Sequence, residues 1–175
     1  MFKRILLAVD GSAHAARATE TAADIAAAFD AELVLVNVLS VSVSLEEIER
    51  RVEAHSFPQS VKEDMQNMRD TLKGRPASGT VTYAHIPAPW SAIAALGEQI
   101  LGDADRVAKG RKVARVTRVA VPGHPAQEIL DQATKRNVDL IVMGTRGLTD
   151  IGALVLGSVS HKVIHLAKCP CLTVK

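Results

Sequence analysis

The strongest constraint on this 175-residue chain is a strand-length apolar run that ends in closely spaced glycines. Val138–Val142 has the length and composition of a strand buried on both faces of a sheet. Gly144 and Gly147 follow this run, and Gly157 comes ten residues after Gly147. Apolar residues then recur at helical spacing as far as Leu166. The segment therefore predicts a strand, a glycine-rich loop and the start of a helix.

This arrangement suits an anionic ligand. Glycine lets backbone N–H groups come close to a ligand and turn toward it. A helix N-terminus adds unpaired N–H groups and the positive end of the helix dipole. Ser158 and Ser160 place hydroxyl groups at the expected helix start. The alternative is a plain strand-to-helix connection whose glycines only form turns. Because the glycines form a spaced set, we favour phosphate binding.

The first forty residues predict a strand, a helix and a second strand. Residues 3–9 are apolar and end at Asp10, and Ser12 is a suitable helix N-cap. Glu32–Leu39 is the second strand, and a strand–helix–strand unit of these lengths predicts a parallel pair with a right-handed crossover. The expected buried face of the helix consists of Ala15, Ala18, Ala22, Ile25, Ala26 and Phe29.

The segment 40–90 predicts two short helices and an irregular connection. Capping-box patterns at Ser44–Glu47 and Ser60–Glu63 each open a stripe of apolar residues. Residues 74–90 contain three prolines and predict an irregular stretch, with a short edge strand at 80–86. We interpret the methionine stripe and Trp90 as packing residues, and a lid or an oligomer contact is the alternative.

The rest of the chain alternates between helices and strands. The expected elements are a helix over 91–109, a third strand over 112–121, a helix from Pro125 to about Asn137 and a closing strand Cys171–Val174. Such alternation predicts an α/β fold with an open, twisted parallel sheet covered by helices on both faces.

Composition excludes several classes of function. A net charge of +2 and an aromatic content of 3% argue against nucleic acid as a partner. No apolar run reaches the length of a membrane span, and the apolar start lacks a signal-peptide cleavage site. Cys169 and Cys171 are separated only by Pro170, which favours a reducing compartment over a disulfide framework. We therefore expect a cytoplasmic protein.

The motifs of several other nucleotide, metal and hydrolase sites are incomplete or absent in this sequence. The run 152–158 has the glycine spacing of a P-loop, but no lysine stands between Gly157 and Ser158. His161 and His165 have the spacing of a zinc protease helix, yet Lys162 occupies the position of its glutamate, so surface histidines are expected. The chain has neither a G-x-G-x-x-G after the first strand nor a G-x-S-x-G elbow. No catalytic residue and no metal cluster are predicted.

Several motifs together resemble the universal stress protein family, in the order in which that family carries them. They are residues 2–12, Val121–Leu130, the Gly144-x-x-Gly147 pair with Gly157-Ser158 nine residues later, and Lys168–Lys175. The resemblance covers about residues 1–39 and 91–175. It implies one domain over 1–175 with a five-stranded parallel sheet in the order 3-2-1-4-5. That fold is Rossmann-like, of the adenine nucleotide alpha hydrolase-like type, and the segment 40–90 is longer than the family usually carries.

The resemblance also implies a ligand, ATP or AMP, bound where the strand order reverses. Mg²⁺ is expected only as the companion of a triphosphate. Asp10 has an alternative interpretation as a turn or capping residue, and Arg146 as a solvated loop residue. The implied nucleotide-binding residues are Ala8, Val9, Asp10, Ser12, Val38, Gly123, Met143, Gly144, Thr145, Arg146, Gly147, Gly157, Ser158, Val159 and Ser160.

Two functions follow as hypotheses. The first is an adenine-nucleotide-binding regulatory module of the stress response, with at most very slow ATP hydrolysis. The second is a scaffold or chaperone-like protein that does not depend on nucleotide. In the family the closing strand forms the dimer contact, so both hypotheses include a homodimer through Cys171–Val174. An ATP-consuming transferase is the least favoured, because no catalytic base is evident.

Overall fold

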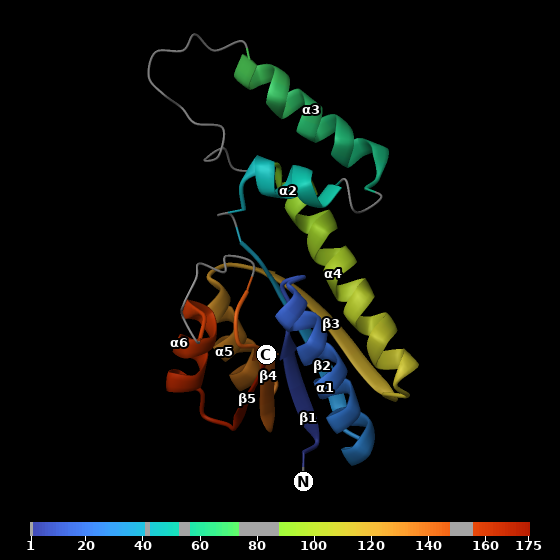
Figure 1. The fold of residues 1–175 in the computed structure, drawn as a ribbon, viewed down its shortest axis with the longest axis vertical. Helices are drawn as coiled ribbons and strands as arrows, with labels where there is room; N and C mark the ends of the chain where they lie inside the picture. The colour runs from blue at the N-terminus through green and yellow to red at the C-terminus, as the bar shows by residue number, and fades with distance from the viewer. Residues whose placement is uncertain (1, 41–42, 53–56, 74–87, 148–155) are drawn as a thin grey trace.

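A five-stranded, all-parallel sheet forms the centre of the structure. The computed structural model describes residues 2–40, 43–52, 57–73, 88–147 and 156–175. The sheet order is β3-β2-β1-β4-β5, as predicted (Figure 1). Its strands are β1 (Arg4–Ala8), β2 (Glu32–Leu39), β3 (Arg115–Pro122), β4 (Leu140–Gly144) and β5 (Cys171–Val174).

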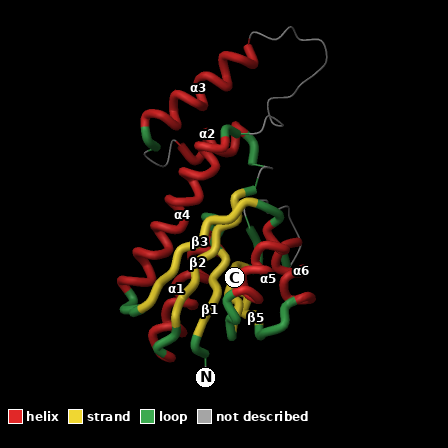
Figure 2. Tube along the Cα trace, turned by 180° about the vertical axis from the view of Figure 1, so that it is seen from behind, coloured by secondary structure: helices red, strands yellow, loops and turns green. Residues whose placement is uncertain are grey.

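Helices cover both faces of this sheet. One face carries α1 (Ala13–Phe29) and α4 (Trp90–Gly110), and the other carries α5 (Pro125–Lys135) and α6 (Ser158–Leu166) (Figure 2). Two further helices, α2 (Leu45–Val52) and α3 (Gln59–Lys73), lie beyond the carboxyl ends of the strands (Figure 1). Within the described ranges, no helix combines the length and the hydropathy that a bilayer crossing requires.

The alternation of side chains along each strand divides the core into two layers. Ile5 and Leu7 pack with α1 and α4, whereas Leu6 and Val34 pack with α5 and α6. All four side chains are completely buried. A strand that is buried on both faces needs apolar residues at consecutive positions. An unbroken apolar run in the sequence therefore predicts a central strand.

Helix α1 begins as predicted. The Oγ of Ser12 accepts a hydrogen bond from the N–H of Ala15 at 3.1 Å, which satisfies one of the unpaired amides of the first turn. The four predicted alanines and Thr19 are buried along the inner face. Phe29 was expected on that face, but 39% of it is exposed, because it lies at the helix end and packs edge-to-face on Phe2.

Helices α4 and α5 end in the same hydrogen-bonded turn. Lys112 has a φ of 65°, and the N–H of Val113 donates to the carbonyl of Ala108 at 3.1 Å. After α5, Asn137 has a φ of 50° and the N–H of Val138 donates back five residues in the same way. These are left-handed C-terminal caps.

The caps correct two predicted strand boundaries. The third strand was expected over 112–121 and the fourth over 138–142, but they span Arg115–Pro122 and Leu140–Gly144. The apolar residues at the start of each predicted strand belong to the preceding helix cap, where Val113 and Val138 are buried. The hydrophobic pattern alone does not distinguish a valine that starts a strand from a valine that is buried beside a helix C-cap.

Helices α2 and α3 and the first half of α4 form a helical extension with its own apolar cluster. Its members include Ile48, Val61, Met65 and Leu96, all buried. The predicted serine cap holds for α2, where the Oγ of Ser44 accepts from the N–H of Glu47 at 3.1 Å. The burial of Met65 confirms its prediction as a packing residue.

Two predictions for this extension are wrong. Ser60 does not cap α3: the helix begins at Gln59, and the carbonyl of Pro58 accepts from the N–H groups of Val61 and Lys62 at 3.1 and 3.3 Å. Trp90 is not a core residue, because 49% of it is exposed at the first position of α4. The edge strand expected at 80–86 lies outside the described residues.

Two glycines of α4 provide a matched test of packing. A Cβ on Gly97 would lie 2.8 Å from Oδ1 of Asn37 and would also collide with Leu39, and both of these side chains are buried. A Cβ on Gly102 would meet only a guanidinium nitrogen of Arg118, at 3.8 Å. We therefore expect Gly97→Ala to destabilise the protein by about 1–3 kcal/mol. Gly102→Ala should stabilise it by about 0.5–1 kcal/mol, because alanine favours the helix.

Urea unfolding followed by far-UV circular dichroism checks both variants. Effects of the same sign and size would contradict the close contact between α4 and β2.

Asp139 provides a pH-dependent link between the starts of β1 and β4. Its carboxylate accepts the N–H groups of Lys3 and Arg4 at 2.7 and 2.8 Å, and these bonds hold the pKa of Asp139 below its ordinary value. The stability that this group contributes is therefore present above the ordinary carboxyl pKa and is lost as the pH falls toward the folded-state value.

We expect Asp139→Asn to lower the free energy of unfolding at pH 7 by about 1 kcal/mol, a modest effect because the carboxylate is partly exposed. The difference from the unmodified protein should disappear as the pH falls through the region just below the ordinary aspartate pKa. Denaturant titrations across that range measure it, and a difference that stays constant with pH would contradict this assignment.

Candidate functional site

The ends of β1 and β4 lie side by side at the point where the strand order reverses. Ala8 pairs with Met143 in the parallel ladder between these strands, and β2 lies on the other side of β1. Connections from this point lead to opposite faces of the sheet, which leaves a crevice at the carboxyl edge. The loop after β1 carries Asp10, and the loop after β4 carries the predicted glycines.

Close contacts hold the two loops together. A Cβ on Gly147 would lie only 2.6 Å from Oδ2 of Asp10, so the glycine loop passes directly against this carboxylate. The other carboxylate oxygen of Asp10 accepts the N–H of Ser12 at 2.9 Å. Asp10 therefore orders its own turn and contacts the glycine loop at the same time.

The glycine loop is also tied to the start of α6. The N–H of Gly157 donates to the carbonyl of Thr145 at 2.8 Å, and the hydroxyl of Ser160 donates to the carbonyl of Gly144 at the same distance. Gly157 precedes the first helical residue and supplies no side-chain cap. No side chain at Gly157 therefore caps the N–H groups in the first turn of α6. The residues of this turn, Ser158, Val159 and Ser160, line the crevice.

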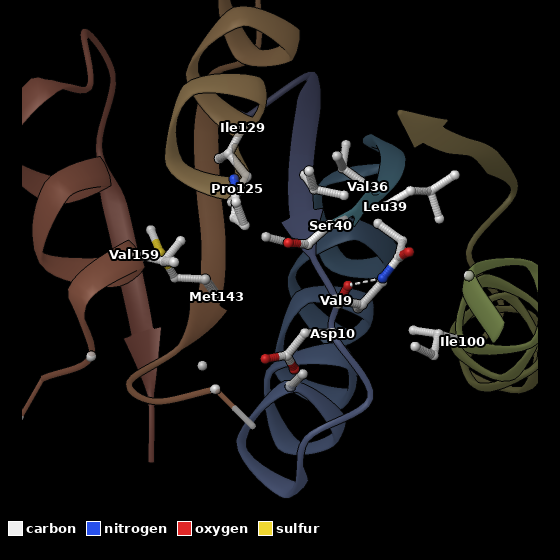
Figure 3. Close-up of a pocket in the computed structure, with 18 of the residues that line it drawn as sticks. Val9, Asp10, Val36, Leu39, Ser40, Ile100, Pro125, Ile129, Met143 and Val159 are labelled. Carbon is white, nitrogen blue, oxygen red and sulfur yellow. Dashed lines mark hydrogen bonds between the residues drawn. The ribbon is translucent and has the colours of Figure 1, made fainter. Parts of the chain in front are cut away.

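A cavity of about 520 Å³ occupies this crevice (Figure 3). Its volume lies in the range of roughly 300–1,000 Å³ that is typical of sites for small molecules and cofactors. Figure 3 shows Met143 and Val159 on one side of the cavity, Asp10 and Val9 in the middle and Ile100 on the other side. The predicted residues that line it are Ala8, Val9, Asp10, Val38, Met143, Gly144, Arg146, Gly147, Gly157, Ser158, Val159 and Ser160.

Three predicted residues are not among those lining the cavity. Ser12 is buried and caps α1. The hydroxyl of Thr145 donates to the carbonyl of Val174 at 3.2 Å, which links the glycine loop to β5. Gly123 has a φ of 145°, a value that favours glycine, and a Cβ there would collide with Glu128. Each of these residues supports the loops in this structure.

Sequence reasoning missed the wall that α4 contributes. Ile93, Leu96 and Ile100 line the cavity. Asn37 of β2 also lines it, and its amide nitrogen donates to the carbonyl of Val9 at 2.7 Å. Figure 3 shows Ile100 on this side of the cavity. One signal was present, because Asn37 is a polar residue inside the apolar run of a central strand. A buried amide of this kind requires a partner.

The cysteines and paired histidines lie elsewhere. His161 and His165 are exposed on α6, as predicted, with parallel rings whose centroids are 6.5 Å apart. Burial raises the pKa of both the Cys169 and the Cys171 thiols, which favours the unreactive protonated form. Among the residues that the structure describes, no cluster of three or more His, Cys, Asp or Glu side chains is placed to hold a metal ion.

Comparison with known proteins identifies the family. The model of the universal stress protein family matches residues 1–175. The chain belongs to the universal stress protein family. Universal stress protein YxiE of Bacillus subtilis is 30% identical over 175 residues, which cover 100% of both chains.

Solved universal stress proteins share the Rossmann-like α/β fold. UspA from Lactobacillus plantarum has a TM-score of 0.70 at 19% identity, and the match covers 99% of this chain and 98% of that chain. A universal stress protein in complex with cAMP has a TM-score of 0.62 at 25% identity, with 99% and 97% of the two chains covered.

Two glycines of this universal stress protein should respond differently to alanine. A Cβ on Gly144 would lie 2.8 Å from Cβ of His14 and 2.9 Å from the carbonyl oxygen of Arg146, whereas a Cβ on Gly157 would make only ordinary contacts at 3.4 Å. We expect Gly144→Ala to cost about 1–3 kcal/mol of unfolding free energy. Gly157→Ala should cost less than about 0.5 kcal/mol.

Parallel urea titrations of the two variants measure this difference. Equal losses would mean that the loop after β4 does not pack on α1 as described.

Proposed function

We propose that this protein binds an adenine nucleotide at the carboxyl edge of β1 and β4 and acts as a regulatory module of the stress response. The observation that carries the proposal is the meeting of the Asp10 turn, the glycine loop and the start of α6 at one cavity. A related universal stress protein of the same fold was solved with cAMP, which supports an adenine nucleotide as the ligand class.

The phosphate groups belong at the glycine loop in this proposal. The backbone N–H groups of Gly144, Gly147 and Gly157 and the hydroxyl of Ser158 serve as donors, and Arg146 adds positive charge. Ser160 contributes its backbone N–H rather than its hydroxyl, because the hydroxyl proton already bonds to the carbonyl of Gly144.

The nucleoside belongs between the ends of β1, β2 and β4. Ala8 at the end of β1 and Val9 and Asp10 just after it contact the nucleoside. Val38 contacts the adenine from β2, and Met143 lies below the ribose. Val159 lines the same side as Met143 (Figure 3). Ser12, Thr145 and Gly123 act by holding the loops rather than by contact with the ligand.

ATP and AMP are both candidates, with Mg²⁺ as the companion of ATP. Hydrolysis is at most slow, since Asp10 already accepts a backbone amide and packs against Gly147.

The whole chain 1–175 acts as one domain, in which 40–90 is an extension. A cytoplasmic location fits the two free cysteines, which suit a reducing compartment.

The second candidate function is a homodimeric scaffold that does not need nucleotide. The observation in its favour is β5, which among the described strands pairs with β4 alone and lies at the edge of the sheet, and whose four residues are all partly exposed. An unpaired strand edge can add a second chain through backbone hydrogen bonds. A homodimer through this edge is compatible with nucleotide binding as well.

The first test is to denature freshly purified protein and to identify any released nucleotide by mass and absorbance.

Gly157→Val then tests the site, because the branched side chain of valine obstructs the approach of phosphate to the loop. We expect affinity for ATP and AMP to fall roughly 10–100-fold, as for the loss of one or two hydrogen bonds to a charged group. Isothermal titration calorimetry measures this change.

Gly110→Val is the matched control, since a Cβ there would have no atom within 4 Å. Circular dichroism establishes that both variants are folded. An unchanged affinity in folded Gly157→Val would refute the proposed site. A protein that is purified empty and does not bind added nucleotide would favour the scaffold.

A further inference from the structure

The cavity continues past the edge of the sheet onto the face that α1 and α4 cover. Along β2, Val36 and Val38 belong to the layer of α5 and α6, whereas Asn37 and Leu39 point the opposite way, toward α4. All four residues line the same cavity. The space therefore has two parts that meet at the ends of β1 and β2, and Figure 3 shows Ile100 across from Met143 with Val9 between them.

We define the α4 chamber as the part lined by Leu39, Val43, Ile93, Leu96 and Ile100. Ile93, Leu96 and Ile100 are spaced three and four residues apart on α4 and so share one face of the helix. Between them, Gly97 brings α4 close to β2, near Oδ1 of Asn37. Val43 adds a wall from the segment before α2, and its carbonyl accepts the N–H of Ala88 at 3.2 Å.

The chemistry of the α4 chamber differs from that of the glycine loop. All five of its defining side chains are aliphatic, and Asn37 already donates to the carbonyl of Val9. None of these five side chains offers a hydrogen-bond partner to a phosphate, a ribose or a purine edge, so such a group would lose its hydrogen bonds to water against them. An apolar group would gain from burial. The half-buried carboxylate of Glu47, which also lines the cavity, disfavours an anionic end on that group.

We propose that the ligand of this protein is an adenine nucleotide that carries an uncharged apolar substituent, and that the α4 chamber binds this substituent. The phosphate lies at the glycine loop, and an alkyl or aryl group extends across the end of β2 toward Ile100. This inference rests on the proposed nucleotide site. It adds that the α4 chamber selects nucleotides that carry an apolar substituent. The substituent is attached either to the base or to the phosphate.

Two pairs of AMP derivatives test the proposal and distinguish these attachment points. One pair is N6-methyl-AMP and N6-hexyl-AMP, and the other is the methyl and hexyl esters on the phosphate. Calorimetric titration compares the members of each pair with each other and with AMP. We expect one hexyl compound to bind more tightly than its methyl counterpart, roughly fourfold for each methylene that the chamber buries.

Filling the chamber should remove this advantage. Ile100→Phe and Val43→Phe introduce larger side chains from two different walls of the chamber. In each variant the ratio of hexyl to methyl affinity should fall to about one, whatever the affinity for AMP itself. Val107→Phe is the matched control on the same helix, since Val107 is 38% exposed and does not line the cavity. This control should keep the full preference for the hexyl compound.

The outcomes separate this inference from the proposed function. If AMP binds but neither hexyl compound gains affinity, the α4 chamber does not select an apolar substituent and the inference is wrong. A gain that survives in both filling variants, each folded by circular dichroism, also overturns it. If neither AMP nor any derivative binds, the proposed nucleotide function itself fails.

Discussion

The complete burial of β1 between β2 and β4 is the constraint on which the rest of the structure depends. Ile5, Leu6 and Leu7 have no exposed surface, so both faces of this strand must be covered by helices. A parallel neighbour on each side requires crossovers that leave in opposite directions, one toward α1 and α4 and the other toward α5 and α6. The crevice at the end of β1 follows from that geometry, and Gly144, Gly147 and Gly157 lie at it.

Of the three glycines in this motif, Gly144 and Gly147 are needed for close approach, and none of the three is needed for an unusual backbone conformation. Gly144, Gly147 and Gly157 are not among the glycines with positive φ, whereas Gly11 and Gly123 are. Without side chains, the first two let the loop after β4 touch α1 and the carboxylate of Asp10. Gly157 leaves ordinary clearance, so its lack of a side chain opens space toward the cavity instead. The absence of a side chain thus permits close contact at Gly144 and Gly147 and leaves open space at Gly157.

The sequence predicted the sheet well because its strands are short apolar runs separated by clear helix signals. The strand order depended on resemblance, since no local pattern specifies which strands are neighbours. Errors occurred where one residue type serves two roles, as at Val113 and Val138, which pack under helix caps instead of starting strands. The α4 wall was missed for another reason. Ile93, Leu96 and Ile100 look like any helical core stripe, and only the fold brings them to the end of β2.

Helix α4 links the helical extension to the cavity at the end of β1. Its first half contributes Ile93 and Leu96 to the apolar cluster that holds α2 and α3, and the same two side chains line the α4 chamber. Its second half packs Leu101, Ala104 and Ala108 against the sheet and α1. A ligand that fills the chamber contacts side chains on which the packing of the extension depends. If the proposed ligand fills the chamber and favours one arrangement of those side chains, its differential affinity shifts the stability of α2 and α3 by the corresponding free energy.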